Sequence, residues 1–179
     1  MVEKLAYLSL GSNIGDRQGN LERAVSALER ERIRVTAKSS IYETEPQDVT
    51  DQPWFLNMVV ACEMSYFPLQ LLAVLRSIER AMGRVKSGVT RRGPRLIDID
   101  ILLFGNLTME TVQLTIPHPR MLGRRFVLEP LLEINKGLRY PVGNGLIIAH
   151  LKQLAGQTVR NYRARAQPVD FAFGKMEAD

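Results

Sequence analysis

The sequence of 179 residues predicts an α+β fold, and two observations carry that prediction. Two segments repeat apolar residues at the spacing of an amphipathic helix, and four others alternate or run apolar in the way of β-strands. The elements follow the order strand, helix, strand, strand, helix, strand, at approximately 4–10, 17–30, 33–42, 55–64, 68–82 and 97–102. This βαββαβ order is typical of a ferredoxin-like αβ plait, and extra C-terminal helices would give it three layers, α/β/α.

The first half of the chain is explained by its caps and its apolar spacing. Gly11 ends the first strand, and Asp16 is expected to cap a helix that continues to about Arg30. That helix has an apolar stripe at i, i+3, i+4 and i+7, formed by Leu21, Ala24, Val25 and Leu28. The pair Gly11 and Gly15 is not a P-loop, because no Gly-Lys-Ser/Thr follows it, so phosphate binding must come from elsewhere.

The second half repeats this logic. Pro68 suits the first turn of a helix and Gly83 its end, with a buried stripe of Leu71, Val74, Leu75, Ile78 and Met82. The strand after it is expected at the centre of the sheet. Beyond Phe104 the pattern predicts a short hairpin up to Ile116, a helix at Phe126–Ile134 and a further helix within Gly143–Leu154.

Composition places the chain among ordinary globular proteins. With 45% hydrophobic residues it is expected to form one domain over residues 1–160, followed by a loosely ordered tail over 161–179. The single Cys62 favours a reducing cytoplasm. No signal peptide or run of about 20 apolar residues is evident, which favours a soluble protein. The net charge of +5 favours anionic partners without distinguishing a nucleotide from a nucleic acid.

The stretch Arg91–Leu102 carries the strongest chemical signal. Alternation places Asp98 and Asp100 on one face of a strand, with Cα atoms about 7 Å apart, where two Mg²⁺ ions would fit between the carboxylates and an anionic ligand. Three guanidiniums surround the preceding Gly93-Pro94 turn, those of Arg91, Arg92 and Arg95. A triphosphate suits both the arginines and the metal-bound aspartates, since it offers negative charge to arginine and oxygen ligands to the metal. The alternative is an acidic strand end paired with a basic loop.

Two further segments suggest ligand contacts. Phe55 and Asn57 share a face of their strand, so that a ring and an amide could stack on a flat heterocycle and read its edge. The alternative is a core phenylalanine beside a turn-capping asparagine. The basic loop Lys86–Arg92 could close over bound phosphates.

The run Gly93–Leu102 resembles the signature of the 6-hydroxymethyl-7,8-dihydropterin pyrophosphokinase family. The resemblance extends in the family's order over roughly Leu5–Asn135. It includes Leu10–Asn13, Ser40–Thr44, Asp51–Pro53, Phe55–Asn57, Gly83-Arg84, Ile116–Met121, Arg124 and Phe126. Such agreement in order makes chance implausible.

The resemblance implies transfer of the β,γ-diphosphate of ATP to a pterin alcohol in folate biosynthesis, with release of AMP. It implies catalytic roles for Arg84, Arg95, Asp98 and Asp100, the two aspartates holding two Mg²⁺ ions. It implies pterin contacts from Thr44, Phe55, Asn57 and Phe126. It implies nucleotide contacts from Glu79, Arg92, Ile101, Thr115, His118 and Arg124. The expected partners are ATP, the pterin and other folate-pathway enzymes, with no nucleic acid and no membrane.

The chain departs from some members of the family near the nucleotide. Arg92 stands where some members have tryptophan, Arg76 stands where a glutamine occurs, and the loop from Arg84 to Gly93 is about one residue longer than in the shortest members. These changes bear on loop closure and adenine contact, and we expect altered affinity with the same reaction.

Other functions remain open from the sequence. An RNA-binding module would explain the basic charge and the plait, but two carboxylates on a central strand would repel phosphate unless metal intervenes. A nuclease or another Mg²⁺-dependent transferase could use the same acids. A purely structural role leaves the arginine and aspartate cluster without a purpose.

Overall fold

The computed structural model describes residues 3–46, 51–83 and 94–162, and within these ranges it contains two antiparallel sheets and four α-helices. The strands are β1 (Lys4–Ser12), β2 (Arg34–Lys38), β3 (Tyr42–Thr44), β4 (Phe55–Met64), β5 (Asp98–Phe104), β6 (Met109–Glu110), β7 (Thr115–Ile116) and β8 (Val159–Asn161). The helices are α1 (Arg17–Arg30), α2 (Pro68–Ala81), α3 (Arg125–Ile134) and α4 (Ile148–Leu151), with 3₁₀ turns η1 (Met121–Gly123) and η2 (Lys152–Leu154). The mixed helix and sheet content expected from the sequence is confirmed.

The main sheet has the order β5-β1-β4-β3-β8, and β2 pairs with β4 beside β3. Every pairing in it is antiparallel. The strand that carries Asp98 and Asp100 therefore lies at an edge of the described sheet, next to β1, and the expectation of a central strand is wrong. The central positions belong to β1 and β4, whose long apolar runs are buried on both faces.

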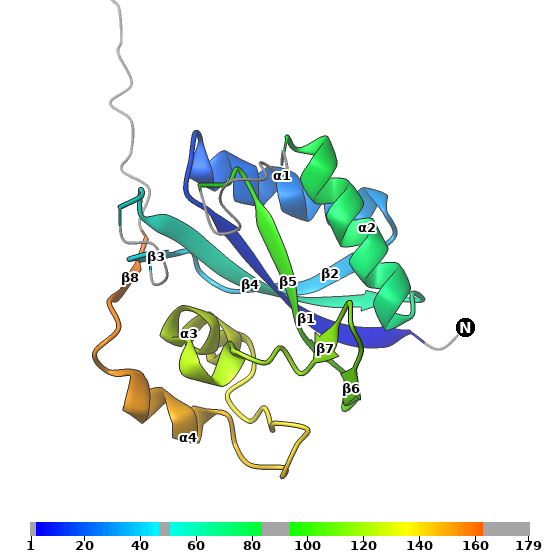
Figure 1. Ribbon diagram of the computed structural model, residues 1–179, viewed down its shortest axis with the longest axis vertical. Helices are drawn as coiled ribbons and strands as arrows, with labels where there is room; N and C mark the ends of the chain where they lie inside the picture. The colour runs from blue at the N-terminus through cyan, green and yellow to red at the C-terminus, as the bar shows by residue number, and fades with distance from the viewer. Residues whose placement is uncertain (1–2, 47–50, 84–93, 163–179) are drawn as a thin grey trace, which may run out of the picture.

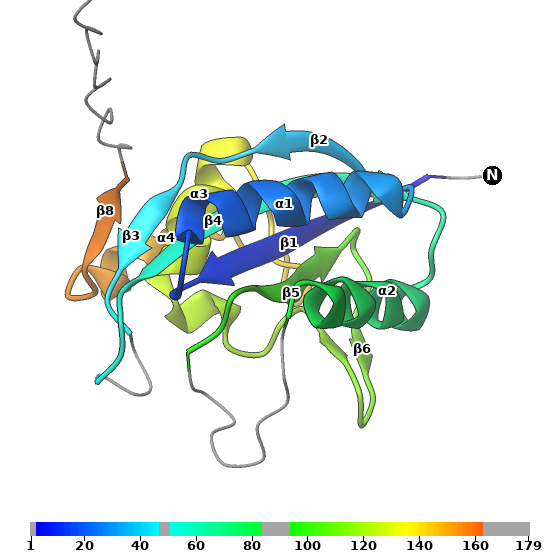
Figure 2. The ribbon, with the colours of Figure 1, turned by 90° about the horizontal axis from the view of Figure 1, so that it is seen from above.

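Helices cover both faces of the sheet. Figure 1 shows α1 and α2 on one side and α3 and α4 on the other, and Figure 2 shows the same division from above. Two separate apolar clusters fill these interfaces. Leu8 and Leu10 pack toward α1 and α2, whereas Tyr7 and Val59 pack toward α3. The period-two alternation of β1 and β4 thus supplies two cores from the same strands.

Local signals set the helix boundaries. Asp16 caps α1 as predicted, since its Oδ1 accepts a hydrogen bond from Gly19 N at 3.0 Å, an interaction typically contributing about 1 kcal/mol. Pro68 is the first residue of α2, and Gly83 follows its end with φ of +94°, a conformation that favours glycine. On α2 the fully buried residues are Leu71, Leu75, Ile78 and Glu79, whereas Val74 and Met82 are half-buried.

Of the other predicted helices and strands, some are confirmed and others are shorter or divided. The hairpin before Ile116 is confirmed as β6 and β7, and the helix at Phe126–Ile134 is confirmed as α3. The helix within Gly143–Leu154 is only the short α4 followed by η2. The β-like segment 33–42 divides into β2 and β3.

Two predicted segments, the loop Lys86–Arg92 and the tail beyond Tyr162, lie outside the described residues. Among the described residues, no helix is both long enough and apolar enough to cross a lipid bilayer.

A β-bulge interrupts the pairing of β1 with β5. Tyr7 pairs with Leu103 and Leu8 with Ile101, which leaves Leu102 as the extra residue. Both Leu102 and Leu103 consequently belong to the cluster on the α3 side. The bulge also leaves the Leu102 carbonyl available to accept a hydrogen bond from His118 N at 2.9 Å, which fastens the chain after β7 to the strand.

Candidate active site

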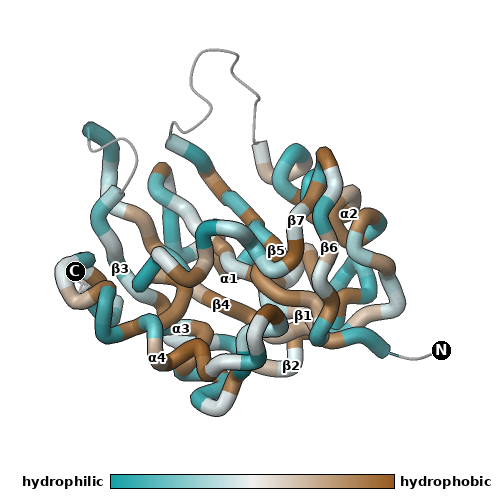
Figure 3. Tube along the Cα trace, turned by 60° about the horizontal axis from the view of Figure 1, so that its bottom comes forward, coloured by the Kyte–Doolittle hydropathy of each residue, from teal (hydrophilic) through white to brown (hydrophobic). Residues whose placement is uncertain are grey.

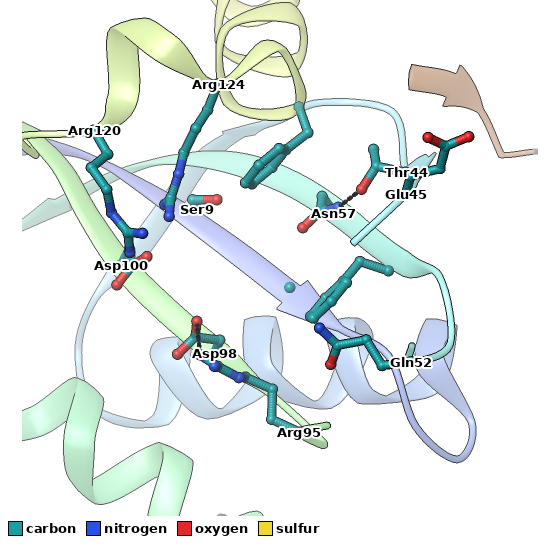
Figure 4. A pocket seen from close by; sticks show the side chains of 13 residues that line it. Ser9, Thr44, Glu45, Gln52, Asn57, Arg95, Asp98, Asp100, Arg120 and Arg124 are labelled. Carbon is teal, nitrogen blue, oxygen red and sulfur yellow. Dashed lines mark hydrogen bonds and ion pairs between the residues drawn. The ribbon is translucent and has the colours of Figure 1, made fainter. Parts of the chain in front are cut away.

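A pocket of about 460 Å³ opens on the α3 side of the sheet, above the ends of β1, β4 and β5. Its lining comes from these strands, from the segments around β3 and from the start of α3. The lining residues are Ser9, Gly11, Thr44, Glu45, Gln52, Phe55, Asn57, Arg95, Asp98, Asp100, Arg120, Arg124 and Phe126. Most of its charged side chains lie around β5, at the charged end, whereas Thr44 and Asn57 lie at the other, neutral end, with the carboxylate of Glu45 beside Thr44 (Figure 4).

Strand register places the floor of the pocket. Gly11 pairs with Asp98 on one side and with Asn57 on the other, so a glycine separates the acid from the amide in one row across the sheet. Two strand spacings of about 4.8 Å separate the two outer strands. A Cβ at Gly11 would lie 2.9 Å from Asn57 Oδ1, closer than real contacts allow. The floor is hollow here because the position is glycine.

The charged end is built on β5 and the turns around it. Asp98 and Asp100 point to the pocket face as predicted, whereas Ile99 and Ile101 point into the opposite core. Arg95 Nη1 donates to Asp98 Oδ2 at 2.6 Å. Arg120 and Asp100 point toward one another, and Arg124 reaches down toward Ser9 (Figure 4). In Figure 3 hydrophilic and hydrophobic residues alternate along the start of this strand. Cationic and anionic side chains are therefore interleaved over one small area.

His118 lies beside this end and is not in the pocket lining. Its Nε2 is 3.8 Å from Asp100 Oδ2, and its Nδ1 accepts a hydrogen bond from Arg120 N at 3.1 Å. Burial, followed by the charges of Arg124 and Arg120, lowers the pKa of His118 to about 4. The ring is consequently neutral at neutral pH, with its proton on Nε2, facing Asp100.

The neutral end is built on β3, β4 and the start of α3. Thr44 pairs with Phe55 across the two strands, and Asn57 Nδ2 donates to Thr44 Oγ1 at 2.7 Å. Both polar side chains are almost completely buried. Phe126 also lines the pocket, and the guanidinium of Arg124 lies 5.5 Å from the centroid of its ring. Two aromatic rings and an oriented amide in the lining of one pocket suit a flat, polar-edged ligand.

Glu79 lies behind the charged end and does not line the pocket. It is 5% exposed on α2, and its Oε1 accepts a hydrogen bond from Ile99 N at 2.8 Å. In this position the carboxylate ties α2 to the edge of β5. A buried carboxylate that accepts a main-chain N–H is a common structural arrangement.

The pocket brings together Thr44, Phe55, Asn57, Arg95, Asp98, Asp100, Arg124 and Phe126 from the sequence-predicted residues. Glu79, Ile101, Thr115 and His118 lie outside its lining. The Ile101 side chain is buried in the opposite core, so only its main chain could reach a nucleotide. Arg84 and Arg92 lie outside the described residues.

Sequence reasoning missed five lining residues: Ser9, Gly11, Glu45, Gln52 and Arg120. Ser9 and Gly11 occupy the same face of β1, and the pairing of β1 with β5 sets them opposite Asp100 and Asp98. That signal exists only once the register is known. Arg120 belongs to the Pro-His-Pro-Arg run noted in the sequence, without a role there.

The donor set at the charged end fits Mg²⁺. The described residues contain no group of three or more His, Cys, Asp or Glu side chains able to hold a metal ion, and the carboxylates that line this end of the pocket are those of Asp98 and Asp100. Mg²⁺ is commonly held by one or two carboxylates, with water and substrate phosphate oxygens completing its shell. A site of this kind is complete only when an anionic substrate is present.

Comparison with known proteins gives consistent matches. The family model described as 7,8-dihydro-6-hydroxymethylpterin-pyrophosphokinase (HPPK) matches residues 7–136. A 2-amino-4-hydroxy-6-hydroxymethyldihydropteridine pyrophosphokinase of Bacillus subtilis is 48% identical over 134 residues, covering 74% of this chain and 79% of the relative. The protein of that name from Methylorubrum extorquens is 42% identical over 164 residues, covering 91% of this chain and 94% of the relative.

Longer relatives contain the same unit within larger chains. The folic acid synthesis protein fol1 of Schizosaccharomyces pombe is 44% identical over 160 residues, which are 89% of this chain and 22% of that protein. Among solved structures, an HPPK-DHPS in complex with substrates superposes with a TM-score of 0.68 at 16% identity, covering 86% of this chain and 43% of that one. The structural match supports the fold, and the chain spans less than half of that protein.

Proposed function

The chain belongs to the 7,8-dihydro-6-hydroxymethylpterin-pyrophosphokinase family, and on that premise we propose that it transfers diphosphate from ATP to 6-hydroxymethyl-7,8-dihydropterin in folate synthesis. The pterin hydroxymethyl oxygen forms a bond to the β-phosphorus of ATP. The bond between that phosphorus and the oxygen bridging it to the α-phosphorus breaks, and AMP leaves. The observation that carries the proposal is that one pocket has both an aromatic, amide-lined end and a charged end.

At the neutral end, the side chains orient the acceptor. Phe55 and Phe126 stack on the two faces of the pterin, and Asn57 reads its amide-like edge. The bond from Asn57 Nδ2 to Thr44 Oγ1 fixes the amide, so that Oδ1 faces the ligand. Thr44 contributes through its main chain. Orientation of this kind lowers the barrier because the attacking oxygen is held in line with the phosphorus.

At the charged end, the side chains handle the phosphates. Asp98 and Asp100 hold Mg²⁺, two ions in our proposal, which when bound neutralise charge on the transferring diphosphate. Arg95 and Arg124 contact phosphate oxygens, and we assign the same role to Arg84, which lies outside the described residues. Phosphoryl transfer needs mainly positioning and charge stabilisation from a protein, and arginine forks supply both.

The nucleotide lies on the outer side of β5 in this proposal. We assign nucleotide contacts to four described residues, Glu79, Thr115, His118 and, through its main chain, Ile101. We assign the same role to Arg92, which lies outside the described residues. His118 is neutral, so its Nε2–H donates a hydrogen bond without adding positive charge.

We also propose that the fold is a ferredoxin-like plait and that the protein associates with other folate-pathway enzymes. The strand order β5-β1-β4-β2 with α1 and α2 on one face supports a ferredoxin-like plait, with α3 and α4 as the added third layer. We propose one catalytic domain over residues 1–160. Fused relatives that carry this unit within longer folate-synthesis proteins support association with other enzymes of that pathway.

Nucleotide product analysis tests the function. With ATP, Mg²⁺ and 6-hydroxymethyl-7,8-dihydropterin, we expect AMP that requires both pterin and metal. Formation of ADP would identify an ordinary kinase, and pterin-independent cleavage of oligonucleotides would identify a nuclease. Tight, magnesium-independent binding of single-stranded RNA would support the RNA-binding alternative. Each of these results would overturn the proposal.

A further inference from the structure

Asn13 lies beneath the pocket, in the turn that joins β1 to α1, and is 1% exposed. It does not line the pocket, and the roles proposed above leave it unused. A buried amide needs partners for both of its N–H bonds and for its oxygen. The partners of Asn13 lie 39 or more residues away in sequence, in two separate segments: one precedes β4 and the other precedes β5.

On the charged side, Asn13 makes two hydrogen bonds with the main chain of Arg95, accepting one and donating the other. Arg95 N donates to Asn13 Oδ1 at 2.8 Å, and Asn13 N donates to Arg95 O at 3.2 Å. The guanidinium of this same Arg95 is bonded to Asp98. The turn residue therefore fixes the backbone from which a phosphate-binding side chain projects.

On the neutral side, the same amide holds the segment that leads into β4. Asn13 Nδ2 donates to Gln52 Oε1 at 3.1 Å and to Pro53 O at 3.2 Å. Gln52 lines the pocket, and Phe55 is the first residue of β4. Arg17 Nη1 donates to Trp54 O at 2.7 Å, so the end of this segment is tied to the start of α1 as well.

We infer that Asn13 is a positioning residue that couples the two substrate sites. The inference rests on the proposed function, since it takes nucleotide at the charged end and pterin at the neutral end. A shift of the Arg95 main chain on nucleotide binding pulls on the Asn13 oxygen, and the Asn13 amide protons transmit it to Gln52 and Pro53. By linkage, pterin binding acts back on the nucleotide by the same factor.

The chemistry of the residue type is specific. An acceptor must face Arg95 N while donors face two carbonyl oxygens, and asparagine supplies both from one planar group. Asn13→Asp retains the shape and the acceptor for Arg95 but loses both donors. Asn13→Ala loses the whole connection.

The test is a binding cycle. The affinity for 6-hydroxymethyl-7,8-dihydropterin is measured by calorimetry with and without saturating Mg²⁺ and α,β-methylene-ATP, an analogue that does not react. In the native protein we expect the nucleotide to change pterin affinity by at least about fivefold. In Asn13→Asp and Asn13→Ala we expect a change within about twofold. Emission of Trp54, the single tryptophan, reports on the same segment and should respond to the nucleotide analogue in the native protein but not in the two Asn13 variants.

Asn135→Ala is the matched control. Asn135 also bridges distant segments, because its Nδ2 donates to Tyr7 Oη at 3.2 Å, but neither residue lines the pocket. We expect this variant to keep the native coupling factor, which separates coupling from general loss of stability. If Asn13→Ala does not fold, the isosteric Asn13→Asp carries the test.

Two results would overturn the inference: no coupling in the native protein, or native coupling in Asn13→Asp. An AMP assay on the native protein runs beside the titrations. AMP formation without coupling refutes the role of Asn13 and leaves the reaction intact. Absence of pterin-dependent AMP refutes the proposed function itself, and the inference that rests on it is then withdrawn.

Discussion

The two ends of the pocket use opposite means to organise their side chains. At the neutral end, Asn57 and Thr44 are buried and hydrogen-bonded to each other. At the charged end, Arg95 and Asp98 are partly exposed and opposite in charge. The first arrangement offers neutral groups with fixed hydrogen-bond directions, beside the single carboxylate of Glu45, which suits recognition of a ligand's shape and edge. The second suits a ligand whose charge changes place during a reaction.

This difference predicts different effects of truncation on binding and on rate. Truncation at the neutral end removes contacts made equally in the ground state and the transition state, so it raises KM for one substrate. Truncation at the charged end removes contacts to the bound nucleotide and also stabilisation of the developing charge, so it weakens nucleotide binding and lowers kcat. Four substitutions test this division.

The largest effect is expected for Asp98→Ala, at the charged end. Loss of one of the two carboxylates proposed to hold Mg²⁺ should lower kcat for AMP formation by about 10³-fold or more, a change of roughly 4 kcal/mol in the barrier. Steady-state assays over a range of Mg²⁺ measure it. Glu110→Ala, an exposed carboxylate on β6, is the control and should leave kcat unchanged. An Asp98→Ala enzyme within tenfold of native would refute the role of this residue.

Asn57→Ala probes the neutral end. Loss of the oriented amide should raise KM for the pterin by about 10- to 100-fold, since hydrogen bonds in buried sites contribute about 1–3 kcal/mol. KM for ATP should stay within about twofold. Thr44→Val removes only the acceptor at 2.7 Å from Asn57 Nδ2 and should show a smaller increase. Equal increases in KM for both substrates would contradict the assignment of the pterin alone to the neutral end.

Glu79→Leu tests whether the Glu79 carboxylate, which lies behind the charged end, has a structural role or contacts the nucleotide. Because Ile99 N would lose its partner at 2.8 Å, unfolding free energy should fall by about 1–3 kcal/mol in urea titrations. Glu79→Gln keeps an acceptor and should lose less. A large rise in KM for ATP in Glu79→Gln, with native stability, would instead support the nucleotide contact implied by the family.

The smallest effect is expected behind the neutral end, at Glu133 on α3. Its carboxylate accepts hydrogen bonds from Ser40 N, Ser40 Oγ and Tyr42 Oη. Partial burial raises the pKa of Glu133, but these hydrogen bonds outweigh it and hold the net pKa below the usual value. The folded pKa is depressed, so the stabilisation is present above pH 4.5 and is lost as pH falls through the folded pKa.

The matching measurement compares native protein with Glu133→Ala in urea at several pH values. The difference in unfolding free energy should be constant above about pH 6 and should shrink below pH 4.5. A difference that does not change with pH would show that the ionised and protonated carboxyl groups stabilise the fold equally, and would contradict the lowered pKa of Glu133. Catalysis at neutral pH should be unchanged in this variant.

Local patterns predicted most of the elements and one end of the site. Alternation alone put Asp98 and Asp100 on the same face, because a strand has a period of two. Caps at Asp16, Pro68 and Gly83 located the helix boundaries, since each satisfies or relieves a specific backbone requirement.

Features set by long-range pairing could not be obtained in this way. The position of β5 at the edge of the described sheet, the bulge at Leu102 and the glycine between Asp98 and Asn57 all depend on register between strands far apart in sequence. Glu79 was missed as a buried residue for a related reason. A carboxylate on a helix stripe becomes a core group only when a main-chain donor such as Ile99 N meets it.

In this proposal the two ends of one pocket bind two different substrates. Calorimetry on Asn57→Ala and Asp98→Ala measures the two affinities separately. Each variant is titrated with the pterin and, separately, with α,β-methylene-ATP in the presence of Mg²⁺. We expect Asn57→Ala to lose pterin affinity while keeping nucleotide affinity, and Asp98→Ala to show the reverse. Loss of the same ligand in both variants would contradict the division of the pocket.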